Sequence, residues 1–335
     1  MRMPNNIENR EPLMKIRHLT KEFKIKSKKI GGKPQILHAL NDVSLDVYEG
    51  ETLGIIGESG CGKSTLGRTI IQLHKATAGE VEYQGRNIFD LKGPELKALK
   101  KDIQMVFQDP YSSLDPRNTC EDIIAEPLKV HNIITDPKAR QDKVLELMRE
   151  VGLDIQHMNR YPHEFSGGQR QRINVARALS LNPKIIVCDE PVSALDVSIQ
   201  AQVLNLFNRL QRQHNLTYIF ISHDLGVIKH VSDRIAIMYL GRVVELCEAS
   251  QIYENPLHPY TKALLSAIPS TDIDHPHERI RLKGEITSPI DPKPGCRFAA
   301  RCPYACDKCH EPQKLEELMP NHFVSCCRAR EINGL

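Results

Sequence analysis

Residues 57–64 read Gly57-Glu58-Ser59-Gly60-Cys61-Gly62-Lys63-Ser64. The run fits the pattern G-x-x-x-x-G-K-[ST], follows an apolar strand-like segment at 52–57 and opens a segment with helical spacing at 64–73. Glycines let backbone N–H groups turn inward around phosphate oxygens, and a helix N-terminus adds positive potential. We therefore expect a phosphate-binding loop (P-loop), with Lys63 on the β- and γ-phosphates and the Ser64 hydroxyl on Mg²⁺. A glycine-rich turn with an incidental lysine is the alternative, which the strand and helix context disfavours.

A second apolar segment ends in two acids. Residues 184–190 read KIIVCDE, which is typical of a buried strand. Asp189 at its end can hold Mg²⁺ through water, and Glu190 can orient or deprotonate an attacking water. Strands often end in acids, so this segment alone is a weak signal. Because a P-loop precedes it in the sequence, we interpret it as the second half of the same nucleotide site.

A third segment offers another phosphate-binding surface. It reads Phe165-Ser166-Gly167-Gly168-Gln169 and precedes the helix-like run INVARALSL. The serine hydroxyl, the glycine amides and the helix N-terminus all suit phosphate. One P-loop site does not need two such surfaces, so we expect this one to close over the ATP of a partner subunit. A helix capped by Ser166 is the simpler alternative.

The remaining sequence indicates a parallel α/β core. Residues 13–25 and 36–48 alternate like strands around a basic loop, and strand-like and helical segments then alternate to about residue 250. The formal net charge of +3 is too mild to indicate nucleic-acid binding. No apolar run approaches the roughly 18–20 residues of a membrane span, and residues 1–12 lack the apolar core of a secretory signal. We expect a cytosolic chain that meets a membrane through partners.

Together these segments resemble the nucleotide-binding domain of ABC ATPases, over roughly residues 13–250, with the family's LSGGQ signature in the form FSGGQ. The resemblance implies an α/β fold: a P-loop NTPase of ABC type with a RecA-like core, an N-terminal antiparallel β subdomain and a helical subdomain at about 115–175. A small Cys-rich C-terminal extension follows. The resemblance also implies ATP and Mg²⁺ as cofactors.

The resemblance assigns roles to further residues. Gln108 matches the Q-loop glutamine, which senses the Mg²⁺ and γ-phosphate and faces the membrane subunits, and His223 matches the switch histidine at the γ-phosphate. Phe23 matches the aromatic that stacks on adenine, and Asp196 lies in the D-loop at the dimer seam. The expected catalytic residues are Glu190, His223 and Gln108, and the expected Mg²⁺ ligands are Ser64, Gln108 and Asp189. The expected nucleotide-binding residues are Phe23, Gly57, Glu58, Ser59, Gly60, Cys61, Gly62, Lys63, Ser64, Thr65, Asp189, Ser166, Gly167, Gly168, Gln169 and Asp196.

Three further stretches narrow the resemblance to the ATP-binding subunits of oligopeptide/dipeptide importers. They are residues 108–117 (QDPYSSLDPR), residues 255–261 (NPLHPYT) and residues 295–304 (GCRFAARCPY). The predicted organisation is a flexible N-terminus at 1–12, a nucleotide-binding domain at 13–254 and a C-terminal region with the cysteine cluster at 255–335. The family pattern implies four partner subunits: a second ATPase subunit in a heterodimer, two permease subunits and, indirectly, an extracellular substrate-binding protein. No nucleic acid is expected.

Six of the ten cysteines crowd into the tail, at positions 296, 302, 306, 309, 326 and 327. In a cytosolic chain such a cluster indicates a metal site sooner than disulfides. The family pattern matches Cys296, Cys302, Cys309 and Cys326 and implies a [4Fe–4S] cluster. Four thiolates suit iron–sulfur or zinc equally by softness and geometry, so zinc and no metal also stay open. Either Cys306 or Cys327 can substitute for one of the four or be a spectator.

We expect, from this resemblance, an ATPase at the cytoplasmic face of the cell membrane that powers import of peptides or a related small solute. ATP binding closes two nucleotide domains, and the permeases convert that motion into transport. The alternative is a soluble ABC ATPase without a transport role, such as a subunit of a phosphonate-breakdown complex.

Overall fold

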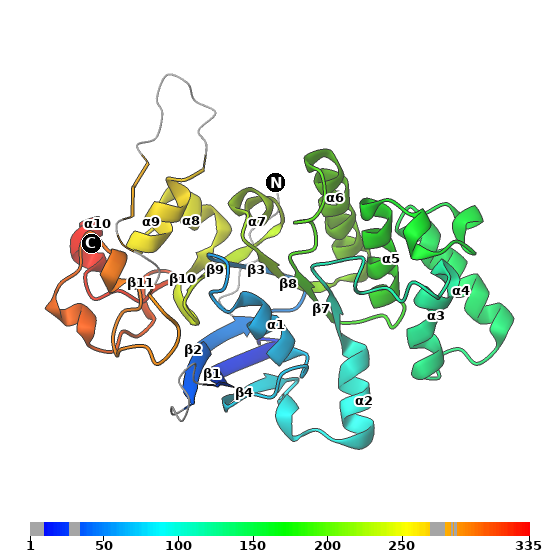
Figure 1. The fold of residues 1–335 in the computed structure, drawn as a ribbon, viewed down its shortest axis with the longest axis horizontal. Helices are drawn as coiled ribbons and strands as arrows, with labels where there is room; N and C mark the ends of the chain where they lie inside the picture. Colours follow the sequence, from blue (N-terminus) through cyan, green and yellow to red (C-terminus); the bar gives the residue numbers. More distant parts are fainter. Residues whose placement is uncertain (1–9, 27–33, 269–278, 283, 285–286) are drawn as a thin grey trace.

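The structure, a computed structural model, describes residues 10–26, 34–268, 279–282, 284 and 287–335. It contains two sheets (Figure 1). The smaller sheet is antiparallel, in the order β2 (Gln35–Val47), β1 (Met14–Ile25), β4 (Ala78–Tyr83) and β5 (Arg86–Asn87). It confirms the two N-terminal strands, while the basic loop between them lies mostly outside the described residues.

The larger sheet has eight strands. Their order is β11 (Glu316–Met319), β12 (His322–Val324), β10 (Arg242–Glu248), β9 (Arg234–Tyr239), β3 (Thr52–Ile56), β8 (Thr217–Ser222), β7 (Ile185–Asp189) and β6 (Ile103–Val106). The run from β9 to β6 is parallel, and every residue of β3, β7, β8 and β9 is buried. Burial on both faces explains why these strands read as continuous apolar runs.

Helices surround this sheet (Figure 1). The α-helices are α1 (Lys63–Ile70), α2 (Gly93–Asp102), α3 (Cys120–Val130), α4 (Pro137–Glu150), α5 (Gly167–Leu179), α6 (Val197–His214), α7 (Leu225–Val231), α8 (Ala249–Glu254), α9 (Pro259–Leu265) and α10 (Ala329–Asn333). Short 3-10 helices span Ile88–Asp90, Ile155–His157, Pro162–Glu164, Ala299–Arg301 and Asp307–His310. Helix α1 ends earlier than the sequence pattern predicts, because Gln72 takes a left-handed φ of 60°. Within the described ranges, no helix combines the length and apolar character needed to cross a membrane.

The predicted helical subdomain corresponds to α3, α4 and α5, which pack on one another. The side chains of Thr119 and Asp136 cap α3 and α4 by accepting backbone N–H groups, and Pro137 occupies the first turn of α4. The apolar faces of these helices join the buried cluster that also contains β7 and α6. This group and the C-terminal residues lie at opposite ends of the molecule (Figure 1).

The C-terminal region is built into both sheets. Strand β12 pairs with β10, and the Pro289 carbonyl accepts the N–H of His38 in β2 at 3.0 Å. The fully buried Glu245 of β10 holds this junction, because its carboxylate lies 2.7 Å from Nε2 of the buried His322 and accepts the N–H groups of Leu257 and His258. A buried carboxylate needs such partners to offset its lost hydration. The cysteine-rich tail is thus continuous with the main sheet.

Candidate nucleotide site

A cavity of about 530 Å³ opens beside the ends of β3, β7 and β8. Polar residues follow parallel strands at their carboxyl ends, so side chains far apart in sequence meet there. The predicted site residues that line it are Phe23, Ser59, Gly60, Gly62, Lys63, Ser64, Thr65, Gln108, Glu190 and His223. Its lining also includes Leu37, His38, Ala39, Leu240, Gly241 and Pro289.

Two glycines of the P-loop occupy positions that exclude a side chain. A Cβ at Gly62 would lie 2.3 Å from the Ala39 carbonyl oxygen, and Gly62 has a left-handed φ of 108°. A Cβ at Gly57 would lie 2.1 Å from the Met238 carbonyl oxygen. The loop can therefore pack against neighbouring backbone only with glycine at both positions.

The P-loop lysine is held by the loop itself. Lys63 is buried, and its Nζ donates to the carbonyl oxygens of Gly57 at 2.8 Å and Glu58 at 3.1 Å. Cys61 is also buried, with its Sγ 3.9 Å from the same Nζ. The ammonium is thereby fixed beside the cavity, where it can meet phosphate oxygens.

Two of the three residues expected at Mg²⁺, Ser64 and Asp189, are in contact, whereas Gln108 donates to Glu190. The Ser64 hydroxyl donates to Oδ1 of Asp189 at 2.7 Å, and Asp189 is fully buried. Its Oδ2 accepts no hydrogen bond from the described residues and has an Arg68 Nη2 at 3.8 Å. Burial raises the pKa of the Asp189 carboxyl, against the opposing effects of Ser64 and Arg68. A buried hydroxyl–carboxylate pair with an unused oxygen fits a hydrated Mg²⁺ ion, whose ligands are oxygens.

Two of the side chains predicted to be catalytic, Gln108 and His223, meet on one carboxylate oxygen of the third, Glu190. Gln108 Nε2 donates to Oε2 of Glu190 at 2.9 Å, and His223 Nδ1 lies 3.1 Å from the same oxygen. Glu190 directly follows β7 and has a left-handed φ of 46°, while its N–H donates to the Ile221 carbonyl at 2.9 Å. This backbone turn places the carboxylate at the cavity and leaves it 12% exposed.

Phe23, on β1 of the small sheet, also lines the cavity. Its ring contacts His74 edge to face at 5.5 Å, and Lys21 Nζ lies 4.7 Å from the ring centroid. The ring is therefore supported by neighbours and presents apolar surface to the cavity. This placement suits the stacking role that the family resemblance implies.

The signature segment lies apart from the cavity lining described above. Ser166 is exposed and caps α5, where its hydroxyl accepts the Gln169 N–H at 3.3 Å and Gln169 Oε1 accepts the Ser166 N–H. A Cβ at Gly168 would lie 2.5 Å from Ile199 in α6, and Asp196 is the N-cap residue of α6. Ser166 therefore caps α5, and the segment is at the same time exposed at the surface, next to the predicted D-loop.

Several residues at the site were not predicted. Pro289 lines the cavity, Arg68 approaches Asp189, and Tyr260 and Arg301 contact Glu58 of the P-loop. The acidic residue Glu58 in a phosphate-binding loop indicates that a cationic side chain should lie nearby. The sequence does not identify that side chain, because Arg301 is 243 positions away from Glu58.

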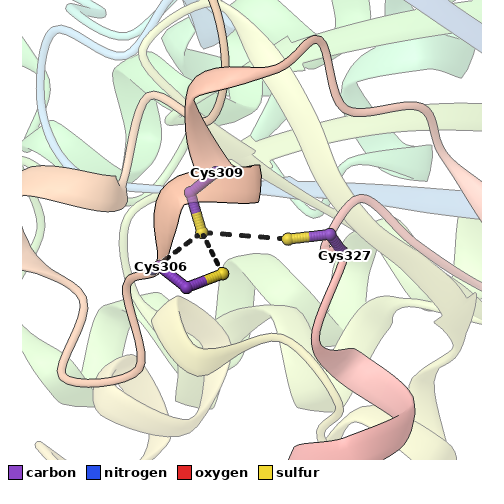
Figure 2. Close-up of side chains that lie close together, drawn as sticks. All are labelled: Cys306, Cys309 and Cys327. Atoms are coloured by element: carbon purple, nitrogen blue, oxygen red, sulfur yellow. Dashed lines mark hydrogen bonds between the residues drawn. The ribbon is translucent and has the colours of Figure 1, made fainter.

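The C-terminal cysteines form a second cluster. The Sγ atoms of Cys306, Cys309 and Cys327 lie within 4.8 Å of one another, and Figure 2 shows the three side chains pointing together. Cys309 Sγ lies 3.9 Å from that of Cys306 and 3.8 Å from that of Cys327. This triad shares one member, Cys309, with the four ligands predicted from the family pattern.

Among the described residues, the other three predicted ligands, Cys296, Cys302 and Cys326, are not part of this triad. Burial raises the pKa of the thiols of Cys296, Cys302 and Cys326, that of Cys296 to about 11, and the charge of Cys309 raises each further. Metal ligation by these residues requires their thiolate form, and a bound cation deprotonates the thiols that coordinate it. The donor set therefore suits a soft metal or an iron–sulfur group.

Comparison with known proteins matches both parts of the chain. Residues 40–193 match the model of the ABC transporter family, and residues 244–309 match that of the oligopeptide/dipeptide transporter C-terminal region. The oligopeptide transport ATP-binding protein AppF of Bacillus subtilis is 52% identical over 95% of this chain and 98% of its own. OppF of Salmonella typhimurium, with the same description, is 52% identical over 96% and 98%.

A solved structure gives the same result for the fold. The ATP-binding cassette MJ0796, in a dimeric post-hydrolysis state bound to ADP and Pi, is 32% identical with a TM-score of 0.62. The match covers 70% of this chain and 98% of that one. The chain belongs to the ABC ATPases, in the family of oligopeptide and dipeptide transport ATP-binding proteins.

Proposed function

We propose that this chain hydrolyses ATP to power the import of peptides through an ABC transporter at the cytoplasmic face of the membrane. Its partners are a second ATPase subunit, two permease subunits and, indirectly, an extracellular substrate-binding protein. The observation that carries the proposal is the division of the nucleotide-binding parts. The P-loop and Glu190 share one cavity, while Ser166 faces outward from another surface.

The division implies two half-sites on each chain. Lys63 and the P-loop amides bind the phosphates of one ATP, and Phe23 stacks on its base. The Ser166–Gln169 segment and the N-terminus of α5 close over the ATP of the second ATPase subunit. Hydrolysis therefore requires two chains face to face, and opening and closing of that pair is the motion passed to the permeases.

The residues of this chain have two chemical tasks: they position the Mg²⁺ ion and the attacking water, and they accept the proton of that water. Ser64, Asp189 and Gln108 would hold a Mg²⁺ ion, which neutralises charge that develops on the phosphates. Glu190 orients the attacking water and accepts its proton. His223 and Gln108 hold the Glu190 carboxylate, and each is placed to respond to the γ-phosphate next to it.

For the tail, we propose a [4Fe–4S] cluster held by Cys296, Cys302, Cys309 and Cys326. Such a cluster, once bound, would cross-link four points of the chain through iron–thiolate bonds. The crowding of six cysteines into the tail and the preference of iron–sulfur groups for thiolate ligands support the proposal. Cys306 and Cys327 are the alternative ligands, because their Sγ atoms are close to that of Cys309.

Co-purification tests the transport role. The tagged chain is expressed from its native locus, membranes are solubilised in mild detergent, and the captured proteins are identified by mass spectrometry. We expect two polytopic permeases and a second ABC ATPase. Capture of soluble proteins alone, as for a phosphonate-breakdown complex, would overturn the proposal.

A matched pair of variants sharpens this test. Tyr111 is 57% exposed in the segment that follows Gln108, where the membrane subunits are expected, and Tyr304 is 42% exposed in the tail. We expect Tyr111→Ala to weaken capture of the permeases and Tyr304→Ala to leave it unchanged.

A further inference from the structure

The side chain of Glu58 turns from the P-loop toward the C-terminal region. Its two carboxylate oxygens lie 2.9 and 3.1 Å from Nη1 of Arg301, in the short helix Ala299–Arg301. The side chains are only 26% and 11% exposed, respectively. An ion pair that is largely withdrawn from water is screened less than one on the surface.

The backbone of Glu58 is held as well. Its N–H donates to the hydroxyl of Tyr260 at 3.0 Å, and its carbonyl accepts Nζ of Lys63 at 3.1 Å. Tyr260 is fully buried, with its ring centroid 4.7 Å from that of Tyr239 and 5.3 Å from that of Phe298. Arg301 also donates to the Tyr239 hydroxyl at 3.4 Å. Glu58 is thus held by Tyr260 and Arg301 of the C-terminal region and by Lys63 of the P-loop.

The charge of Glu58 is a disadvantage for phosphate binding. A carboxylate in a P-loop repels the oxygens of a triphosphate, and that repulsion is strong where water is partly excluded. Arg301 neutralises this carboxylate and draws it away from the loop. Because Lys63 is hydrogen-bonded to the Glu58 carbonyl, a shift of Glu58 also moves the ammonium that meets the phosphates.

We propose that Arg301 and Tyr260 are positioning residues for the P-loop, through which the C-terminal region sets the affinity of the site for ATP. The effect acts on nucleotide binding more than on the chemical step, since both residues contact Glu58 of the P-loop, whose carbonyl also holds Lys63. The inference rests on the ATP binding of the proposed function and adds a second segment of the chain to it.

Equilibrium binding of a fluorescent ATP analogue with Mg²⁺ to the purified full chain tests this. We expect Arg301→Gln to raise Kd about tenfold, because Glu58 is left unpaired beside the phosphates. Arg301→Lys keeps the charge and should restore most of the affinity. The double variant Glu58→Gln/Arg301→Gln should bind more tightly than Arg301→Gln alone, because the unpaired charge is gone.

Controls separate positioning from loss of structure. Arg328→Gln breaks a different tail ion pair, with Glu331, and should leave Kd unchanged. Tyr260→Phe keeps the ring, removes the acceptor for the Glu58 N–H and should raise Kd about threefold. In steady-state assays with the partner ATPase, Arg301→Gln should raise KM for ATP and leave kcat within about twofold of wild type.

Two results would be decisive. If the wild-type chain binds no better than Lys63→Ala, the proposed function itself is wrong. If the wild-type chain binds ATP and Arg301→Gln and Tyr260→Phe bind it equally well, the positioning role is wrong and the proposed function stands.

Discussion

The Nδ1 atom of His223 lies 3.1 Å from Oε2 of Glu190, an oxygen that also accepts a hydrogen bond from Gln108. These three residues come from separate strand ends and meet on one carboxylate. An interaction of His223 or Gln108 with the γ-phosphate therefore changes the position of the group assigned to the attacking water. This contact links the presence of the γ-phosphate to the geometry of hydrolysis.

That link predicts separate effects on binding and turnover. His223→Ala should lower kcat about a hundredfold, because a misplaced Glu190 no longer aligns the water. ATP binding should change little, since Lys63 and the P-loop remain. Phosphate release at saturating ATP measures kcat, with the exposed His230 of α7 changed to Ala as the control. A kcat equal to wild type for His223→Ala would contradict the role.

The backbone of the P-loop predicts different costs for two glycine substitutions. Both Gly60 and Gly62 have positive φ, but a Cβ at Gly60 meets nothing within 4 Å, whereas one at Gly62 meets the Ala39 carbonyl at 2.3 Å. Gly60→Ala should cost about 1 kcal/mol of unfolding free energy from φ strain alone. Gly62→Ala should cost about 3 kcal/mol and abolish ATP binding. Equal midpoints of urea unfolding for the two variants would argue against this packing.

The outward-facing signature predicts a defect that appears only in the assembled pair. Ser166→Asp keeps a good helix cap for α5 but places a negative charge where a partner's phosphates would lie. The isolated chain should bind ATP with wild-type affinity. ATP hydrolysis by the complex should fall about a hundredfold. Reduced ATP binding by the isolated variant would show that Ser166 belongs to the chain's own site.

The tail cysteines predict which substitutions remove bound metal. After anaerobic purification, Cys296→Ser and Cys302→Ser should lose the iron measured by elemental analysis and the visible absorbance of iron–thiolate bonds. Cys306→Ser and Cys327→Ser should retain both. Retention by the first pair and loss by the second would transfer the site to the triad with Cys309. Stoichiometric zinc in a colourless protein would contradict the iron–sulfur proposal.

Local patterns account for the parts of the site that were predicted. The P-loop and the Asp189–Glu190 pair at the end of β7 are each a short contiguous stretch of sequence, and their residue types follow from phosphate and metal chemistry. Strands β3, β7 and β8 could be predicted because burial on both faces leaves long apolar runs. The resemblance to ABC ATPases then implied that Lys63, Glu190 and His223 act on one nucleotide, and the three line one cavity.

Long-range contacts account for what was missed. The contact of Arg301 with Glu58 and the place of Pro289 at the cavity depend on how the C-terminal region folds back over β2. Neither the hydrophobic periodicity nor the motif spacing of the sequence predicts such a contact. The grouping of Cys306 with Cys327 depends likewise on turn geometry around Cys309, which cysteine spacing does not define.

The most direct test of the account is ATP turnover by Glu190→Gln in the purified complex with its partner ATPase and permeases. The substitution keeps the shape of the side chain and removes its ability to accept a proton. The ATP site of the partner ATPase is inactivated in the same complex, so that only this chain's site can release phosphate. We then expect phosphate release to fall by at least about a hundredfold while ATP binding persists. Turnover at the wild-type rate would contradict the assignment of this cavity as the site of hydrolysis.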